Sequence, residues 1–216
     1  MKAYVGEPTG KLANFFKDLG IGACISPFTK QNIKRHSFWF LDNGAFTYWK
    51  KKQPFNEKAF YRLLEKAENK RPDFVILPDL VAQGLQSLKF SEYWLNRLEN
   101  EGFKHTWALA LQDGMKTEDI RSFIEGAPIS VLFVGGTVKW KIRTGHEWVE
   151  LAHRYGLTCH IGRVGSMKRV IWARRIGADS IDSALPLFSK EKLDRFLRAL
   201  TVPLQAELPL FNVRHP

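Results

Sequence analysis

The chain has few cysteines, no long hydrophobic run and a shortage of acidic residues, and each of these excludes a class of protein. Cys24 and Cys159 are the only cysteines among 216 residues, too few for a cysteine-rich zinc site or a disulfide framework. No apolar run approaches the roughly 20 residues of a membrane-spanning helix. The first residues also lack the hydrophobic region of a signal peptide. We therefore expect a protein of the reducing cytoplasm with no membrane contact.

The charge balance points to an anionic partner. Lys and Arg number 33 against 22 Asp and Glu, which gives a formal net charge of +11, and 44% of the residues are apolar. The apolar content suffices for a globular core and is too high for a disordered chain. The positive excess favours binding to polyanions, nucleic acid first. A soluble protein that is merely basic would have the same composition.

Short apolar runs recur along the whole chain and predict buried strands. Apolar residues continue within each run instead of alternating with polar ones, as in parallel strands covered on both faces. The runs span residues 3–5, 23–25, 38–41, 74–77, 107–111, 131–134, 159–161 and 180–185.

Amphipathic segments lie between these runs and predict helices. The stripe with helical spacing that is easiest to recognise comprises Phe60, Leu63, Leu64 and Ala67. A second stripe at 148–155 follows a Thr144–Glu147 capping box, so we predict that this helix starts near Thr144. A third stripe at 120–124 ends before Gly126 and Pro128. Further helices are expected over 12–19, 85–100, 167–176 and 190–200, with a short one at 30–35.

Strand and helix thus alternate through about eight units, the repeat of a compact (β/α)₈ barrel of the TIM type. We assign residues 1–200 to one such domain and 201–216 to a C-terminal extension, because Pro203, Pro209 and Pro216 interrupt that tail. An open doubly wound sheet is the structural alternative.

Polar residues follow several of the predicted strands. Asp42, Asp79 and Asp182 each stand where an apolar run ends, and Gln112 and the pair Gly135–Gly136 end two further runs. The carboxyl ends of barrel strands share one face, where catalytic groups collect. A carboxylate at the edge of a core is costly unless it is hydrogen-bonded or used chemically. We therefore predict one polar site at the mouth of the barrel.

Basic and aromatic residues cluster in segments that we expect to be loops on this same face. Cations beside aromatic rings suit a phosphate backbone with stacked or extruded bases. Solvated lysines above packed tryptophans would give the same pattern. The residues assigned to nucleic-acid binding are Lys50, Lys51, Lys52, Lys139, Trp140, Lys141, Arg143 and Arg163.

Two further features carry less weight. His160 lies inside a strand and is interpreted as a core residue in preference to a catalyst. The turn at 162–166 precedes a helix and could bind a phosphate through backbone N–H groups, or could be a plain tight turn. No metal-ligand spacing or Gly-rich phosphate loop is present, so we expect neither metal nor cofactor.

Five segments in order make the chain resemble the tRNA-guanine transglycosylase superfamily, over roughly residues 38 to 190. Residues 41–46 are similar to that family's Asp-Ser-Gly-Gly-Phe segment, 111–114 to its Gln-Gly-Gly and 134–137 to its Gly-Gly-Leu-Ala. Residues 177–186 resemble Gly-Ile-Asp-Met-Phe-Asp-Cys-Val-Leu-Pro, and Asp79 matches the aspartate that reads the purine edge.

The resemblance implies a role for each of these positions. Asp182 would be the nucleophile and Asp42 the general acid/base. The remaining residues would bind the base: Asp79, Gln112, Gly135, Gly136, Thr137 and Asn43. The chain lacks the three-cysteine zinc site of the tRNA enzymes, and Lys139–Lys141 replace a glutamate of the family. These departures favour the relatives in phages and bacterial mobile elements that insert 7-deazaguanine bases into DNA.

We therefore expect an enzyme that exchanges guanine in DNA for a free 7-deazaguanine (preQ0-type) base. The alternatives are a tRNA-guanine transglycosylase, a base glycosidase without exchange, and a nucleic-acid-binding barrel without chemistry. In the tail, Leu208, Leu210 and Phe211 resemble peptides that dock on bacterial sliding clamps, while packing of the tail on its own barrel is the favoured interpretation.

Overall fold

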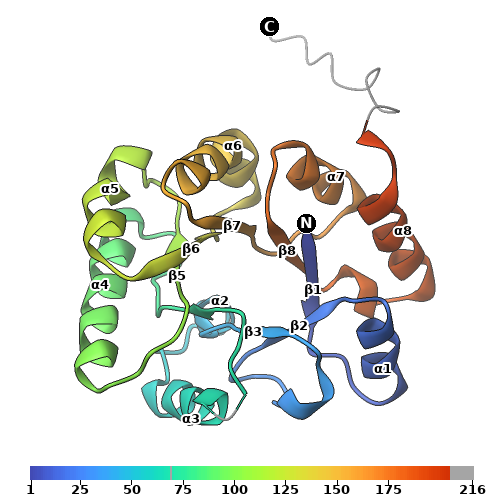
Figure 1. The fold of residues 1–216 in the computed structure, drawn as a ribbon, viewed down its shortest axis with the longest axis horizontal. Helices are drawn as coiled ribbons and strands as arrows, with labels where there is room; N and C mark the ends of the chain where they lie inside the picture. The colour runs from blue at the N-terminus through green and yellow to red at the C-terminus, as the bar shows by residue number, and fades with distance from the viewer. Residues whose placement is uncertain (69, 205–216) are drawn as a thin grey trace, which may run out of the picture.

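The computed structural model describes residues 1–68 and 70–204, and in this part of the chain eight parallel strands close into a barrel (Figure 1). Each strand pairs with the next in chain order, and β1 pairs with β8. The strands are β1 (Lys2–Gly6), β2 (Gly22–Ile25), β3 (Trp39–Leu41), β4 (Val75–Ile76), β5 (Trp107–Leu111), β6 (Ile129–Val134), β7 (Thr158–Ile161) and β8 (Ser180–Ser183). The predicted (β/α)₈ barrel is confirmed, and the open sheet is excluded.

Helices surround the barrel and connect successive strands (Figure 1). They are α1 (Lys11–Asp18), α2 (Ala45–Lys50), α3 (Glu57–Glu68), α4 (Gly84–Asn100), α5 (Thr117–Gly126), α6 (Val138–Arg154), α7 (Met167–Arg175) and α8 (Lys190–Thr201), with short 3₁₀ turns at Ile33–Arg35 and Leu185–Leu187. The stripe predicted on α3 is buried as expected. The tail segment 205–216, with its clamp-like residues, lies outside the described residues.

Aromatic rings fill the inside of the barrel. Phe40 stacks on Phe74 with ring centroids 4.7 Å apart, and Tyr4 meets Phe40 edge-on at 5.0 Å. Phe133 stacks on His160 at 4.8 Å. The opposite face of each strand packs against the helices, where the larger part of the core lies. Burial on both faces explains why the apolar runs do not alternate.

Of the segments that we expected to be loops, 139–143 is helical and 49–52 is helical in its first half. Lys50 is the last residue of α2, with Lys51 and Lys52 in the turn after it, and α6 begins at Val138, six residues before the predicted start at Thr144. Thr137 is the true N-cap, with its hydroxyl accepting from the Trp140 N–H at 3.4 Å. Thr144 lies in the helix interior, where its hydroxyl donates to the Trp140 carbonyl at 2.9 Å. The capping-box prediction is therefore wrong, because a helical Thr can bond the carbonyl one turn back.

None of the helices in the described ranges is long and apolar enough to cross a membrane.

A glycine inside α6 sets how closely α6 packs against α7. Gly145 is buried, and a Cβ added there would lie 2.7 Å from the Trp172 ring and 3.3 Å from Ile176. Alanine in a helix interior normally stabilises by about 0.5–1 kcal/mol relative to glycine. Here we predict that Gly145→Ala destabilises the fold by about 1–3 kcal/mol, because the ring must be displaced. Denaturant unfolding measures the change.

Gly126, the last residue of α5, supplies the matched control, since an added Cβ meets nothing within 4 Å. Gly126→Ala should leave the free energy of unfolding equal or slightly higher. Equal or greater stability of Gly145→Ala would contradict the packing of α7 against this glycine.

Candidate active site

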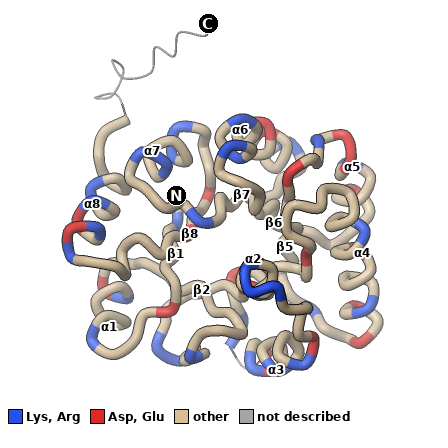
Figure 2. Tube along the Cα trace, turned by 180° about the vertical axis from the view of Figure 1, so that it is seen from behind, with Lys and Arg blue, Asp and Glu red and all other residues tan. Residues whose placement is uncertain are grey.

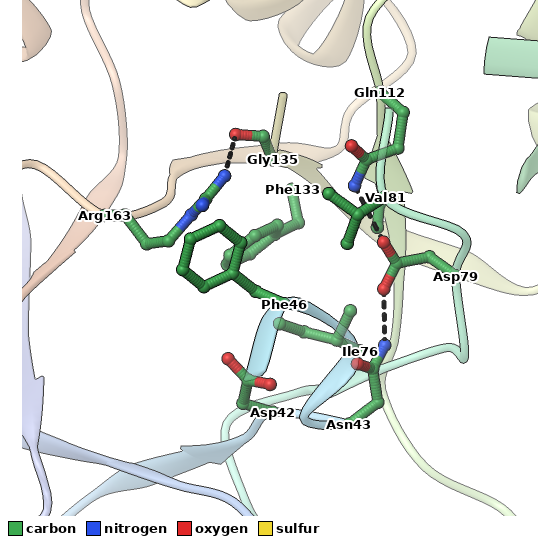
Figure 3. A pocket seen from close by; sticks show the side chains of 11 residues that line it. Asp42, Asn43, Phe46, Ile76, Asp79, Val81, Gln112, Phe133, Gly135 and Arg163 are labelled. Carbon is green, nitrogen blue, oxygen red and sulfur yellow. Dashed lines mark hydrogen bonds between the residues drawn. The ribbon is translucent and has the colours of Figure 1, made fainter. Parts of the chain in front are cut away.

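Four of the six polar and glycine positions predicted to meet at the barrel mouth do lie around one pocket. Asp42 follows β3, Asp79 follows β4, Gln112 follows β5 and Gly135 follows β6. These four line the pocket together with Asn43, Phe46, Ile76, Val81, Phe133 and Arg163 (Figure 3). Asp182 lies in β8. Its carboxylate accepts a hydrogen bond from the backbone N–H of Arg163, a residue of the pocket wall. The barrel topology thus gathers residues separated by up to 140 positions, from Asp42 to Asp182.

Asp79 is held between two amide side chains. Asn43 Nδ2 donates to one carboxylate oxygen and Gln112 Nε2 to the other, each at 2.7 Å (Figure 3). Burial raises the pKa of Asp79 to about 6, although both amide hydrogen bonds oppose this rise. Each oxygen keeps a second lone pair. The result is a fixed carboxylate with spare acceptors facing the pocket.

The two amides are themselves fixed by backbone groups. Asn43 also donates to the Leu77 carbonyl at 2.7 Å and accepts from the Ala45 N–H at 2.7 Å. Gln112 Oε1 accepts from the Ala82 N–H at 3.1 Å. A Cβ at Gly135 would lie 2.8 Å from Gln112 Nε2, so only glycine lets the amide lie against the end of β6. The orientation of Asp79 is therefore set by groups at the ends of four strands, β3, β4, β5 and β6.

Asp42 stands at the opening of α2. Its Oδ1 accepts from the Gly44 N–H at 2.6 Å, and Gly44 has a φ of 82°, which favours glycine. Burial raises the pKa of Asp42 to about 6, and the negative charge of Asp182 adds to this rise. The Gly44 hydrogen bond and the nearby charge of Arg163 only partly oppose it. A carboxyl with this pKa can both donate and accept a proton near neutral pH.

Asp182 has the opposite electrostatic environment. Its Oδ1 accepts from the Arg163 N–H at 3.0 Å and is paired with His160 Nε2 at 3.1 Å. Burial alone would raise the pKa of Asp182, but these donors, chiefly His160, and the charge of Lys141 outweigh it and lower the pKa. Both hydrogen bonds that the described residues give this carboxylate end on Oδ1. The lowered pKa keeps Asp182 ionised near neutral pH, and its Oδ2 accepts no hydrogen bond from the described residues.

His160 was interpreted as a core residue, and the structure shows that it is buried but also bonded to Asp182. Its ring is fully buried, and its Nδ1 lies 2.8 Å from Ser180 Oγ. Burial lowers the pKa of His160, so the neutral ring donates from Nε2 to Asp182 and accepts from Ser180. The strand register explains this contact, because His160 pairs directly with Ser180, two residues before Asp182.

Arg163 points into the mouth instead of outward. Its guanidinium donates to the carbonyls of Gly135 and Gly136 at 3.0 and 2.8 Å, and it stacks on Phe46 with Cζ 3.9 Å from the ring centroid (Figure 3). Its backbone has a φ of 55°, a conformation uncommon for a residue with a side chain. The turn at 162–166 thus places both an N–H and a guanidinium at the site.

The remaining basic residues divide into exposed and buried sets. Lys50, Lys51 and Lys52 are exposed at the end of α2 near the barrel opening (Figure 2), and Lys139 and Arg143 are exposed on α6. Trp140 and Lys141 are only 5% and 4% exposed. The prediction that Trp140 contacts nucleic acid is therefore wrong, and Lys141 reaches no further than the lining of a second cavity beside the pocket. Because α6 is helical there, both side chains turn inward.

Each buried residue has a structural partner. Trp140 packs on Trp148 with ring centroids 5.8 Å apart. Lys141 donates to the Gly162 carbonyl and so fastens the turn that carries Arg163, and burial lowers its pKa to about 7.

Two of the expected base-binding residues lie beside the pocket. Thr137 is exposed, and its N–H and hydroxyl donate to Asp113 at 2.6 and 2.5 Å. Gly136 packs against Trp140, whose ring an added Cβ would approach to 2.3 Å. In the described part of the chain no group of three His, Cys, Asp or Glu side chains is placed to hold a metal ion.

Comparison with known proteins identifies the fold only. No family model matches the chain, and no curated protein matches it. Among solved structures it resembles a mandelate oxidase variant with an FMN adduct, with a TM-score of 0.57 and 12% identity over 91% of this chain and 71% of that one. It also resembles 3-hexulose-6-phosphate synthase from Salmonella typhimurium, with a TM-score of 0.52 and 11% identity over 93% and 98%.

The pKa values of Asp42 and Asp182 are shifted in opposite directions. Replacing each aspartate by the neutral asparagine should therefore change the melting temperature in opposite directions. For Asp42, with a pKa of about 6 in the fold against 3.8 ordinarily, the folded state binds more protons between these values. Its ionisation therefore lowers stability as pH rises. We predict that Asp42→Asn melts about 2–8 °C above the wild type at pH 7.5, and that the gap closes below about pH 4.

Asp182→Asn should behave in the reverse way. Its pKa is lowered in the fold, so its carboxylate contributes stability above its ordinary pKa, and that contribution is lost as pH falls through the lowered value. The variant should melt below the wild type at pH 7.5, and the two should converge in acid. Thermal unfolding across pH 3–8 measures both, and shifts of the same sign in the two variants would contradict these assignments.

Proposed function

We propose that this protein is a base-exchange transglycosylase that replaces guanine in DNA by a free 7-deazaguanine base. The observation that carries the proposal is the pair Asp42 and Asp182. Asp42 lines the pocket, and Asp182 lies behind it, bonded to the backbone of the wall residue Arg163. The environments of the two carboxylates shift their pKa values in opposite directions. Such a pair supplies a proton-transfer group and an ionised nucleophile at the same pH.

The chemistry follows from these two states. An oxygen of Asp182 attacks C1′ of the target nucleotide, the bond from C1′ to the base breaks, and the departing guanine takes a proton from Asp42. The incoming base then loses a proton to Asp42 and attacks C1′, which releases Asp182. An oxocarbenium-like transition state is stabilised by the ionised carboxylate. The substitution leaves the phosphate backbone intact and requires no metal or redox cofactor.

Asp79 supports the choice of a guanine-like base. Its fixed carboxylate presents two acceptors with free lone pairs, which match the adjacent N1–H and N2–H donors of guanine and of 7-deazaguanines. Adenine lacks that pair of donors and would leave the buried carboxylate unmatched, a loss that strongly favours rejection. The amide of Gln112, from the neighbouring strand end, would meet the remaining edge of the base.

DNA is the favoured polymer for two reasons. The resemblance is closest in character to the DNA-modifying relatives, and the zinc site of the tRNA enzymes has no counterpart in the sequence. The exposed Lys50, Lys51 and Lys52 near the mouth would hold phosphates on either side of a nucleotide extruded from the stack. A tRNA substrate is the alternative that the binding experiments below distinguish.

A denaturation-resistant adduct between protein and DNA tests the role of Asp182. Wild-type protein with a guanine-containing oligonucleotide should form the adduct, and Asp182→Ala should form none, because the attacking oxygen is gone. Denaturing electrophoresis and mass spectrometry of the linked peptide identify the residue. An adduct of equal yield in Asp182→Ala would remove the assignment.

Asp42→Asn is the matched comparison in this experiment. It keeps the size of the side chain and its bond to Gly44 but cannot deliver a proton. The adduct should still form on Asp182, more slowly by on the order of 10²–10⁴. Loss of the adduct in Asp42→Asn together with its retention in Asp182→Ala would mean that the two roles are exchanged.

Salt dependence tests the three lysines near the opening. Each neutralised phosphate contributes about −0.7 to −0.9 to the slope of log K against log salt. Replacing Lys50, Lys51 and Lys52 by Ala should flatten this slope and weaken DNA binding at any sequence, without changing which base is accepted. Fluorescence anisotropy at several salt concentrations measures it.

The control triple variant replaces exposed basic residues in the last turns of three helices, at the other end of the barrel: Lys17, Lys66 and Arg154. Its slope should equal that of the wild type. Equal flattening in both variants would mean that the contact surface is not at the mouth, and a preference for RNA hairpins over every DNA would favour the tRNA alternative.

A further inference from the structure

A second cavity lies beside the central pocket at the barrel mouth. It has a volume of about 230 Å³, and its lining includes Phe46, Trp49, Val81, Val138 and Arg163. Phe46, Val81 and Arg163 line both cavities, so these three residues form the wall between them. Nothing in the exchange chemistry uses this second space.

Trp49 is the main unexplained feature of this cavity. Its side chain is 54% exposed, and Val138, which also lines the cavity, is 44% exposed. The Trp49 ring lies 5.8 Å from the Phe46 ring at an interplanar angle of 31°. Single exposed apolar residues need no explanation, but several lining one cavity mark a binding surface. A large aromatic face left open to water is the kind of platform on which nucleobases stack.

The position of the cavity identifies what it can hold. A nucleotide whose base occupies the central pocket has its neighbour one backbone step away, and the two cavities share one wall. Lys50, Lys51 and Lys52 follow Trp49 directly in the chain and are exposed, so a phosphate linking the two nucleotides would meet positive charge. The positive charge of these lysines favours an anionic ligand over a purely apolar one. The aromatic lining of the cavity favours a base over a bare phosphate.

We propose that this second cavity binds the base of the nucleotide adjacent to the extruded guanine in single-stranded or opened DNA, with Trp49 as its stacking platform. The inference rests on the proposed function for the identity of the neighbouring nucleotide. It makes Trp49 a binding residue that fixes the position of the strand and contributes to the choice of sequence context. Its mechanism is independent of the carboxylates, because stacking needs no proton transfer.

The test is a double-mutant cycle between Trp49 and the DNA. Dissociation constants are measured for single-stranded oligonucleotides that carry an abasic analogue on one side or the other of the target guanine. The proteins compared are the wild type, Trp49→Ala, Trp49→Phe and the control Tyr93→Ala, whose ring is 57% exposed on α4. Because Trp49 is exposed, melting temperatures should be unchanged.

We expect Trp49→Ala to weaken binding of the intact oligonucleotide between about 5- and 150-fold, while Trp49→Phe retains most of the affinity. An abasic analogue at one flanking position should weaken the wild type by a similar factor and leave Trp49→Ala unaffected. Tyr93→Ala should bind like the wild type. Additive losses, or no loss in Trp49→Ala, would overturn the proposal.

Measuring binding and base exchange separately distinguishes the failure of this proposal from the failure of the proposed function. Coupling between Trp49 and one flanking base in a protein that exchanges no base would retain the second cavity and reject the transglycosylase. Normal base exchange without coupling between Trp49 and a flanking base would retain the transglycosylase and reject the second cavity as a base-binding site. Coupling seen with RNA oligonucleotides and never with DNA would overturn the choice of DNA as the bound strand.

Discussion

Three carboxylates lie largely out of water at one end of the barrel, and hydrogen-bond donors from neighbouring strand ends make their burial possible. Asp79 receives two amide donors, Asp182 receives a backbone N–H and a histidine, and Asp42 receives one backbone N–H. Burial favours the protonated form of all three, and only at Asp182 do the hydrogen bonds and nearby positive charge outweigh it. A barrel that did not close would separate β1 from β8 and would not bring these groups to one mouth.

Arg163 connects the parts of this mouth. Its N–H binds Asp182, its guanidinium binds the end of β6, and its flat face covers Phe46. Lys141 supports the same turn from below through the Gly162 carbonyl. In this arrangement a planar cation already lies on Phe46 beside the carbonyls of the pocket wall. A planar base that entered the pocket would contact this Arg163–Phe46 pair, because both residues line it.

Much of the framework could be predicted from the sequence, because continuous apolar runs and helical stripes report burial directly. The strand ends at Asp42, Asp79, Gln112 and Asp182 could be predicted for the same reason. Predictions from local sequence patterns were wrong where the same pattern is compatible with two different local structures. The Thr144 capping box is a valid pattern that the interior of α6 also satisfies, and the helical path of 139–143 buries Trp140 and Lys141.

The bond between His160 and Asp182, and the inward turn of Arg163, were not predictable without the register of β7 against β8.

The most direct measurement of the central claim is mass spectrometry of nucleosides after purified protein is incubated with DNA, tRNA and an isotopically labelled 7-deazaguanine base. Base exchange predicts labelled deoxynucleoside in the DNA, one guanine released for each base inserted, and an intact backbone. Release of guanine without insertion, or label found in tRNA and absent from DNA, would contradict the claim that this barrel exchanges bases in DNA.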